Sequence, residues 1–279
     1  MSEEPAVREL LVTGLWTYPV KGMAGNPVAS LRFDESGPVD DRRWMLVDAQ
    51  GQFMSQRKTP VLGLFHASLL GQQLRITAPD GEQCPVNPED CTQDTEVTVW
   101  HDTVQVSVAS QAVNQWLGHY LDTPVRLVRY RTDAPRAVNA QWARGQVGFA
   151  DGFPLLVCHE ESLQALNQNA PVPLEMARFR PNVVVSGGEP WAEHDWAALE
   201  SDQHRLNLVK PCERCAVVTL RPGTEERTPT VLRHILAHNA IGGKPVFGVN
   251  AMAGLAESPL MLGEIMRPVT RSTQRVSAT

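Results

Sequence analysis

Alternating apolar and polar positions predict β-strands in the first half of the chain. Residues 97–100 and 104–108 alternate on both sides of a short polar connection, which is typical of two antiparallel strands with one buried face. Residues 10–18 form an apolar run rich in strand formers, and residues 74–77 alternate again. Residues 44–55 have the order strand, turn, strand, which predicts a hairpin. We therefore expect β structure over roughly the first hundred residues.

A change of period predicts one amphipathic helix after this region. Ser110 is a natural helix cap, and five apolar residues follow it at the spacings i, i+3, i+4, i+7 and i+8. They are Val113, Trp116, Leu117, Tyr120 and Leu121. Because these positions share one helix face, we expect Trp116 to belong to the core rather than to a ligand site.

The second half becomes strand-rich again after the polar stretch 131–148, which indicates a domain boundary or a long functional loop. We expect helices near 160–169 and 229–238. Expected strands cover 153–157, 182–186, 206–209, 216–220 and, as the last one, 246–250. Strands outnumber helices and mostly lack the alternation of strand and helix that parallel sheets require. The predicted fold class is mainly β with α (α+β), with two β-rich domains, each a barrel or a sandwich, and helical insertions.

Composition limits the class of protein. The 279 residues are 42% apolar and 20% charged, as in globular proteins with a full hydrophobic core. The net charge of −6 argues against a general nucleic-acid binder, because counterion release needs a basic face. No stretch approaches the roughly 20 apolar residues that a membrane span requires. Residues 1–5 are acidic where a secretory peptide is basic, so we expect a cytoplasmic location.

The cysteines favour a metal site over a disulfide framework. Their number is odd, and no export signal precedes them. Cys212 and Cys215 form a CxxC pair flanked by the cations Lys210 and Arg214. Nearby cations favour thiolate over thiol, and a thiolate suits a soft transition metal.

Two other interpretations of this pair are weaker. A structural zinc site needs four ligands, usually from two such pairs, and Cys84, Cys91 and Cys158 form no second pair. A thiol-exchange site lies at the N-terminus of a helix, whereas this pair precedes the predicted strand 216–220. A pair of buried, inactive cysteines is the simplest alternative.

Three dispersed cations sit beside apolar residues: Lys21, Arg42 and Arg180. A buried cation needs an anionic partner, and for each one alone an ordinary salt bridge is the default. The residue pattern by itself does not bring the three to one site.

Six motifs along the chain resemble a known family. They are Tyr18-Pro19-Val20-Lys21, Asp41-Arg42-Arg43-Trp44, Phe149-Ala150-Asp151-Gly152-Phe153-Pro154, Phe179-Arg180-Pro181-Asn182, Lys210-Pro211-Cys212-Glu213-Arg214-Cys215 and Phe247-Gly248-Val249-Asn250. In this order they resemble the MOSC-domain molybdenum enzymes with an N-terminal MOSC-associated β domain. That family includes the mitochondrial amidoxime-reducing component and bacterial N-hydroxylated-base reductases. The resemblance runs from about Leu11 to about Pro268.

The resemblance implies a MOSC N-terminal β domain at residues 8–128 and a MOSC molybdenum-cofactor domain, a β-barrel, at residues 129–270. It also implies a molybdenum cofactor (Mo-molybdopterin), which carries a terminal phosphate, between the two. Cys215 matches the protein ligand to the metal and is thus the implied catalytic residue, with Cys212 a neighbour in the loop. The implied cofactor-binding residues are Lys21, Gly22, Arg42, Arg180, Asn182, Cys212, Glu213, Arg214 and Asn250. Of these, Lys21, Arg42 and Arg180 match positions at the cofactor's anionic end, where Arg and Lys suit a phosphate.

Three departures from the family pattern are visible. Gly22 stands where Ser is frequent, and Gly152-Phe153 stands where some relatives carry two hydroxyl residues. Glu213 replaces a frequent Ser, so we expect its negative charge near the metal to alter substrate preference.

The resemblance implies a two-electron oxygen-atom transfer from small N-hydroxylated substrates (hydroxylaminopurines, amidoximes, hydroxylamines), which would detoxify N-hydroxylated bases. We expect a separate electron-donor protein, a ferredoxin or a flavin reductase, because no cysteine after Cys215 is present for a fused iron–sulfur domain. His159 and His194 are candidate proton donors, and Asp151 either positions a loop or acts on substrate, with the structural role favoured.

Two further functions stay open. MOSC domains also occur in molybdenum cofactor sulfurases, so the alternative is a sulfur-carrier or cofactor-handling protein with pyridoxal-independent sulfur transfer, in which the cysteine holds sulfur in transit. A thiol oxidoreductase is a third interpretation, and it would need Cys212 and Cys215 equally.

Overall fold

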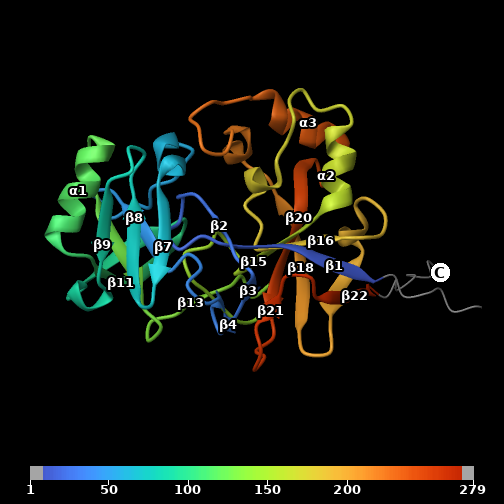
Figure 1. Ribbon diagram of the computed structural model, residues 1–279, viewed down its shortest axis with the longest axis horizontal. Coiled ribbons are helices and arrows are strands. Elements are labelled where there is room, and N and C mark those ends of the chain that lie inside the picture. Colours follow the sequence, from blue (N-terminus) through green and yellow to red (C-terminus); the bar gives the residue numbers. More distant parts are fainter. Residues whose placement is uncertain (1–8, 272–279) are drawn as a thin grey trace, which may run out of the picture.

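The second half of the chain builds a closed seven-stranded barrel, seen at the right of Figure 1. A computed structural model describes residues 9–271. In spatial order the barrel strands are β15 (Leu155–His159), β16 (Val183–Ser186), β1 (Leu10–Thr17), β22 (Ile265–Thr270), β17 (Trp196–Glu200), β18 (Arg205–Glu213) and β20 (Lys244–Ala253). β15 pairs with β20 and closes the ring. The first strand of the chain is thus part of a barrel otherwise built from the second half.

Inward-facing and outward-facing positions alternate along the barrel strands, and the inward-facing residues are apolar. Val12, Val157 and Val249, for example, are fully buried in one cluster. The β15–β16 pair is parallel, whereas the other barrel pairs are antiparallel. Helix α2 (Glu160–Asn167) connects the two parallel strands, and α3 (Thr230–His238) packs against β20.

The first half forms two smaller sheets, at the left of Figure 1. One has the order β10 (Gln93–Val99), β11 (Asp102–Val108), β12 (Arg126–Tyr130), β6 (Trp44–Val47), and the other has the order β7 (His66–Leu70), β8 (Gln73–Thr77), β9 (Gln83–Val86). Strand β6 is buried on both faces, since Leu46 and Val47 belong to different apolar clusters, whereas β10 and β11 keep one exposed face.

Helix α1 (Gln111–Leu121) confirms the predicted amphipathic helix. The Ser110 hydroxyl accepts a hydrogen bond from the Val113 N–H at 3.5 Å, so Ser110 is its cap. Trp116 is partly buried against the core, as predicted. The β10–β11 pair, β8, β16 and the helices α2 and α3 also form where the pattern predicts them.

Short elements complete the chain. The minor strands are β2 (Asn26–Pro27), β3 (Ser30–Leu31), β4 (Phe33–Asp34), β5 (Gly37–Pro38), β13 (Arg136–Ala137), β14 (Gln146–Val147), β19 (Ala240–Ile241) and β21 (Leu260–Met261). The 3-10 helices are η1 (Pro60–Leu64), η2 (Pro88–Asp90), η3 (Met176–Phe179), η4 (Ala192–His194) and η5 (Ala216–Thr219).

The predicted strand at 216–220 is wrong, because these residues form the 3-10 helix η5. The Thr219 hydroxyl donates to the Ala216 carbonyl at 2.7 Å, and Arg178 donates to the carbonyls of Val218 and Leu220 at 3.2 and 2.8 Å. These contacts satisfy the backbone of an apolar run without a strand partner. The strand argument against a thiol-exchange site therefore fails, although η5 is a single short turn and not the α-helix of such sites.

Two other expectations need correction. Strand 246–250 is part of β20 but is not the last strand, because β21 and β22 follow it. The hairpin predicted over 44–55 has only one strand, β6, and its return is a single bridge between Val47 and Phe53. The segment after this bridge instead lines a cavity, described below.

Within residues 9–271, no helix combines the length and the apolar character needed to cross a bilayer. Residues 1–5, on which the expected location rests, and residue 8, where the first predicted domain begins, lie outside the described residues. The boundary between residues 128 and 129 remains a prediction.

Candidate functional site

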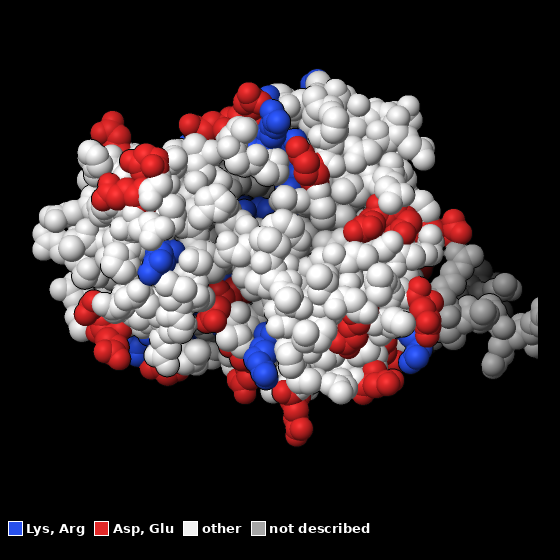
Figure 2. Space-filling model, viewed as in Figure 1, with Lys and Arg blue, Asp and Glu red and all other residues white. Residues whose placement is uncertain are grey.

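A cavity lies where the two halves of the chain meet, and it collects almost all of the predicted site residues. Figure 2 shows Lys and Arg side chains at the bottom of a hollow near the middle of this face. The predicted residues that line the cavity are Lys21, Gly22, Arg42, Arg180, Asn182, Cys212, Arg214, Cys215 and Asn250. Glu213 is the predicted residue that does not line it.

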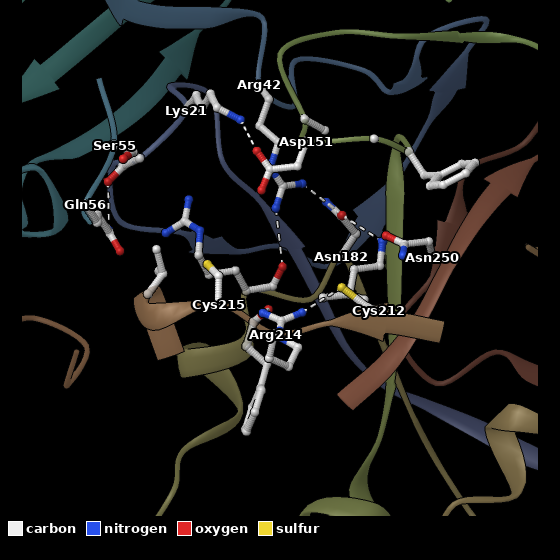
Figure 3. A pocket seen from close by; sticks show the side chains of 18 of the residues that line it. Lys21, Arg42, Ser55, Gln56, Asp151, Asn182, Cys212, Arg214, Cys215 and Asn250 are labelled. Atoms are coloured by element: carbon white, nitrogen blue, oxygen red, sulfur yellow. Dashed lines mark hydrogen bonds and ion pairs between the residues drawn. The ribbon is translucent and has the colours of Figure 1, made fainter. Parts of the chain in front are cut away.

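Lys21 is buried at one side of this cavity and forms an ion pair with Asp151 (Figure 3). Its ammonium also donates to the Phe149 carbonyl at 2.7 Å. Burial lowers the pKa of Lys21, and Asp151 partly offsets this effect. Desolvation by the cavity walls would raise the pKa of Asp151, but the Lys21 ammonium outweighs this effect and holds that pKa below its usual range.

Asp151 presents its carboxylate to the cavity, with 68% of its side chain exposed. The Trp100 indole N–H donates to it at 3.1 Å. Buried Arg136 fixes the backbone at Asp151 by donating to the carbonyls of Ala150 and Asp151 at 2.7 and 2.9 Å. Asp151, for which a structural role was favoured, thus pairs with Lys21 and also lines the cavity.

Arg42 and Arg180 lie against the same aromatic ring, that of Tyr18. Their guanidinium carbons are 4.4 and 4.2 Å from its centroid, within the range of a cation–π interaction. Both arginines have left-handed backbones, with φ of +48° and +56°, a conformation that costs roughly 1–3 kcal/mol for a non-glycine residue and is frequent at functional sites. Burial lowers the pKa of Arg180 to about 10. Tyr18 is thus a site residue to which the motif analysis gave no role.

Asn182 holds Arg42 in place rather than offering its amide to a ligand. It is fully buried, and its Oδ1 accepts from Arg42 Nη1 at 2.9 Å and from the Leu156 N–H at 3.2 Å. Its Nδ2 donates to the Trp16 carbonyl at 3.2 Å. Arg42 is further fixed by its ion pair with buried Asp41 at 2.6 Å.

The CxxC segment spans the end of β18, which contains Cys212, and the residues after it, and it brings both sulfurs to the cavity (Figure 3). Arg214 lies between them in sequence and donates to Cys212 Sγ and to the Phe179 carbonyl, each at 2.9 Å. Burial alone would lower the pKa of Arg214, but the sulfurs of Cys212, Cys158 and Cys215 together raise it.

Glu213 and Lys210 pair with each other, so neither acts on the cysteines as the sequence predicted. Glu213 pairs with Lys244 at 2.7 Å and with Lys210 at 3.2 Å, and the Lys244 hydrogen bond lowers the pKa of Glu213. Arg214 therefore contacts a sulfur, while Lys210 neutralises Glu213. Asn250 reaches the cavity from β20 and donates to the Lys210 carbonyl at 3.2 Å.

The two histidines considered as proton donors lie outside the cavity lining. His159 is fully buried beside Glu161 and Glu193. His194 Nε2 is hydrogen-bonded to Asn239 Nδ2 at 2.9 Å.

The donor set of this cavity fits a soft metal attached to an anionic organic group. Within residues 9–271, no group of three or more His, Cys, Asp and Glu side chains could hold a metal ion, so a metal at Cys215 would need ligands from outside the chain. Arg214 Nε is buried without a hydrogen-bond partner in the described structure. A buried donor of this kind fits an anionic ligand.

Two family matches cover most of the chain. Residues 9–124 match the MOSC N-terminal beta barrel domain, and residues 144–267 match the MOSC domain. Mitochondrial amidoxime-reducing component 1 of Xenopus laevis is 28% identical over 228 residues, 77% of this chain and 66% of that protein. The Homo sapiens protein of the same name is 28% identical over 225 residues, 76% of this chain and 67% of that protein.

A second group of relatives is longer. Molybdenum cofactor sulfurase of Oryza sativa subsp. japonica is 26% identical over 273 residues, which cover 89% of this chain but 33% of that protein. The chain thus spans about two thirds of the amidoxime-reducing components and one third of this sulfurase. With both matched domains in one chain, the protein is a member of the MOSC-domain family that carries a MOSC N-terminal beta barrel domain.

Proposed function

We propose that this protein is a molybdenum-cofactor-dependent reductase that removes oxygen from small N-hydroxylated compounds. The observation that carries the proposal is that the Cys215 thiol shares one cavity with Lys21, Arg42 and Arg180. A thiolate suits a soft transition metal, and Arg and Lys suit a phosphate, so this cavity offers partners for both the metal and the phosphate of Mo-molybdopterin.

The residues take the following roles in this proposal. Cys215 would hold the metal through its sulfur. Lys21, Arg42 and Arg180 would bind the phosphate, with the two arginines ordered by Tyr18, and Arg214 would offset negative charge on the sulfurs. When bound, the cofactor would supply the group that accepts the oxygen atom of the N–O bond. The net reaction consumes two electrons and two protons for each N–OH group and releases the amine or amidine and one water.

The electrons would come from a separate protein, a ferredoxin or a flavin reductase. The physiological substrates would include N-hydroxylated bases, whose removal would be a detoxification in the cytoplasm.

A sulfur-carrier or cofactor-handling function is the second candidate. It is favoured by the sulfurase match, which covers 89% of this chain. In that case Cys215 would carry a persulfide, with Arg214 again offsetting its charge.

Elemental analysis of protein from a molybdenum-replete host, combined with amidoxime reduction, tests the proposal. We expect about one molybdenum per chain, and we expect reduction of benzamidoxime when reduced methyl viologen supplies the electrons. Cys215→Ala should lose both. Cys212→Ala should keep the metal, because Cys212 is a neighbour and not a ligand.

Cys91→Ala is the matched control, since this thiol lies outside the cavity lining, and it should change neither quantity. A metal-free wild type that carries a persulfide would replace the reductase with the sulfur carrier. Equal loss of activity in Cys212→Ala and Cys215→Ala, without bound metal, would favour the thiol oxidoreductase.

A further inference from the structure

We propose that Arg57 forms a second anion-binding subsite in the cavity and selects N-hydroxylated substrates that carry a carboxylate or a phosphate. This inference rests on the proposed function and names a substrate class for it. It concerns the wall formed by residues 53–57, to which the sequence motifs gave no role.

The cavity is lined by more cations than the carboxylates and the proposed cofactor phosphate can pair with. Its lining contains five cations, Lys21, Arg42, Arg57, Arg180 and Arg214, and one carboxylate, Asp151. Asp151 pairs with Lys21, and Asp41 pairs with Arg42.

Three guanidinium groups are then left without a carboxylate. Arg180 lies on Tyr18 beside Arg42, where the cofactor phosphate is proposed to bind. Arg214 donates to Cys212 and to the Phe179 carbonyl, and its remaining buried Nε faces the proposed cofactor site described above. Within residues 9–271 the Arg57 guanidinium contacts the Trp100 ring but makes no ion pair and no side-chain hydrogen bond, so its N–H donors are free for a ligand. In a protein with a net charge of −6, such a local cation attracts an anion that the rest of the surface repels.

Arg57 is held in position before any ligand arrives. Its guanidinium carbon is 4.3 Å from the centroid of the Trp100 ring. Trp100 has a left-handed backbone with φ of +59° at the turn between β10 and β11, and its indole N–H is fixed on Asp151. Phe53 packs against the Trp100 ring at a centroid distance of 4.8 Å.

The backbone of this segment is tied to the other half of the chain. Arg227 Nη2 donates to the carbonyls of Gln56 and Arg57 at 3.1 and 2.9 Å. Because both the ring beneath the guanidinium and the backbone beside it are fixed, an anion bound at Arg57 orders little additional structure.

The same wall offers an apolar surface next to the cation. Phe53 and Met54 line the cavity together with Ser55, Gln56 and Arg57. Figure 3 shows Ser55 and Gln56 on one side of the cavity and Cys212 and Asn250 on the other, with Cys215 between them in this view. A planar N-hydroxylated ligand could therefore pack against Phe53 while its anionic group binds Arg57 as a bidentate partner.

Steady-state kinetics on matched substrates test the proposal, with reduced methyl viologen as electron donor. One pair is benzamidoxime and 4-carboxybenzamidoxime, and the other is N4-hydroxycytidine and its 5′-monophosphate. The pairs separate the carboxylate from the phosphate. We expect Arg57→Ala to raise KM for the anionic member about tenfold, a loss of about 1.4 kcal/mol, and to change KM for the neutral member less than twofold. Arg57→Lys should lie between the wild type and Arg57→Ala.

Lys58→Ala is the matched control, because Lys58 is an exposed cation next in sequence that does not line the cavity. It should leave both members of each pair unchanged. Equal effects of Arg57→Ala on the anionic and the neutral member would overturn the proposal. Loss of molybdenum from Arg57→Ala would also overturn it, because Arg57 would then be a cofactor residue.

Calorimetric binding of 4-carboxybenzamidine and benzamidine provides a readout that does not depend on turnover. Wild type should bind the carboxylate compound more tightly, and Arg57→Ala should bind the two equally. If the wild type reduces no N-hydroxylated compound, the proposed function fails, whereas this binding preference would still support an anion subsite. If the wild type binds both compounds equally, the subsite fails whatever the activity.

Discussion

At the scale of single residues, the site depends on side chains that hold other side chains. Arg42 keeps its position through Asn182, Asp41 and the ring of Tyr18. Asn182 uses its buried amide on three partners at once. Removing such a group leaves buried donors and acceptors unpaired, which costs more than the hydrogen bonds themselves contribute.

Asn182→Leu should therefore destabilise the protein although it keeps the side-chain size. It leaves the buried Leu156 N–H and the Trp16 carbonyl without this partner, and we expect a loss of about 2–4 kcal/mol in the free energy of unfolding. Urea unfolding measures it. Asn87→Leu, at an exposed position, should change stability by less than about 0.5 kcal/mol. Similar values for both variants would contradict the role of Asn182.

At the scale of elements, a bulge directs the CxxC loop. The register between β18 and β20 shifts between Pro211 and Glu213, and Gly248 lies on the opposite strand with φ of +72°. Bulges bend a strand and redirect its side chains, often beside functional sites. Here the extra residue lies on β20, where Phe247 and Gly248 together face Cys212, the first sulfur of the cavity.

Gly248→Ala should destabilise this arrangement. An added Cβ would lie 2.7 Å from both Cys158 Sγ and the Val157 carbonyl oxygen, in a backbone conformation that strains alanine. We expect a loss of about 2 kcal/mol or more in unfolding free energy. Gly254→Ala is the control, because its nearest neighbour is 3.6 Å away, and it should shift stability by less than about 1 kcal/mol. Thermal unfolding of both variants provides the comparison.

At the scale of the whole molecule, buried charges join elements around the barrel. His159 at the end of β15 is bonded to the Gly187 carbonyl at 2.7 Å and lies 2.8 Å from Glu161 and 3.3 Å from Glu193. Burial alone would lower the pKa of His159, but Glu193, Gly187 and Glu161 together raise it. The pKa of Glu161 is correspondingly lowered: its burial is outweighed by hydrogen bonds from Gly187 and Ser186 and by the His159 charge.

This linkage predicts a pH-dependent stability. Because the pKa of His159 in the folded state lies above the value of about 6.5 in the unfolded chain, its contribution is complete below that pH and is lost as pH rises through the folded pKa. The unfolding free-energy difference between wild type and His159→Gln should therefore be largest near pH 6 and shrink towards pH 8. Exposed His119→Gln should show no such trend. A difference that grows with pH would contradict the ion pair.

The sequence alone determined much of this protein through local rules. Alternation at 97–108 and the spacing after Ser110 depend on neighbours within a few residues, and both predicted their elements correctly. Ordered motifs likewise indicated the MOSC domains and nine residues of the cavity. Local pattern failed at 216–220, where Arg178 satisfies the backbone of an apolar run from a distant segment.

Tertiary structure decided what lies beyond such local rules. Contacts between distant segments place Tyr18 against two arginines and Asn182 against Arg42. Such contacts also pair Glu213 with Lys244 and bring Asp151 and Arg57 to the cavity. A sequence gives each of these side chains its charge and size. Packing of the barrel against the sheets fixes the direction of each side chain and the partner that it contacts.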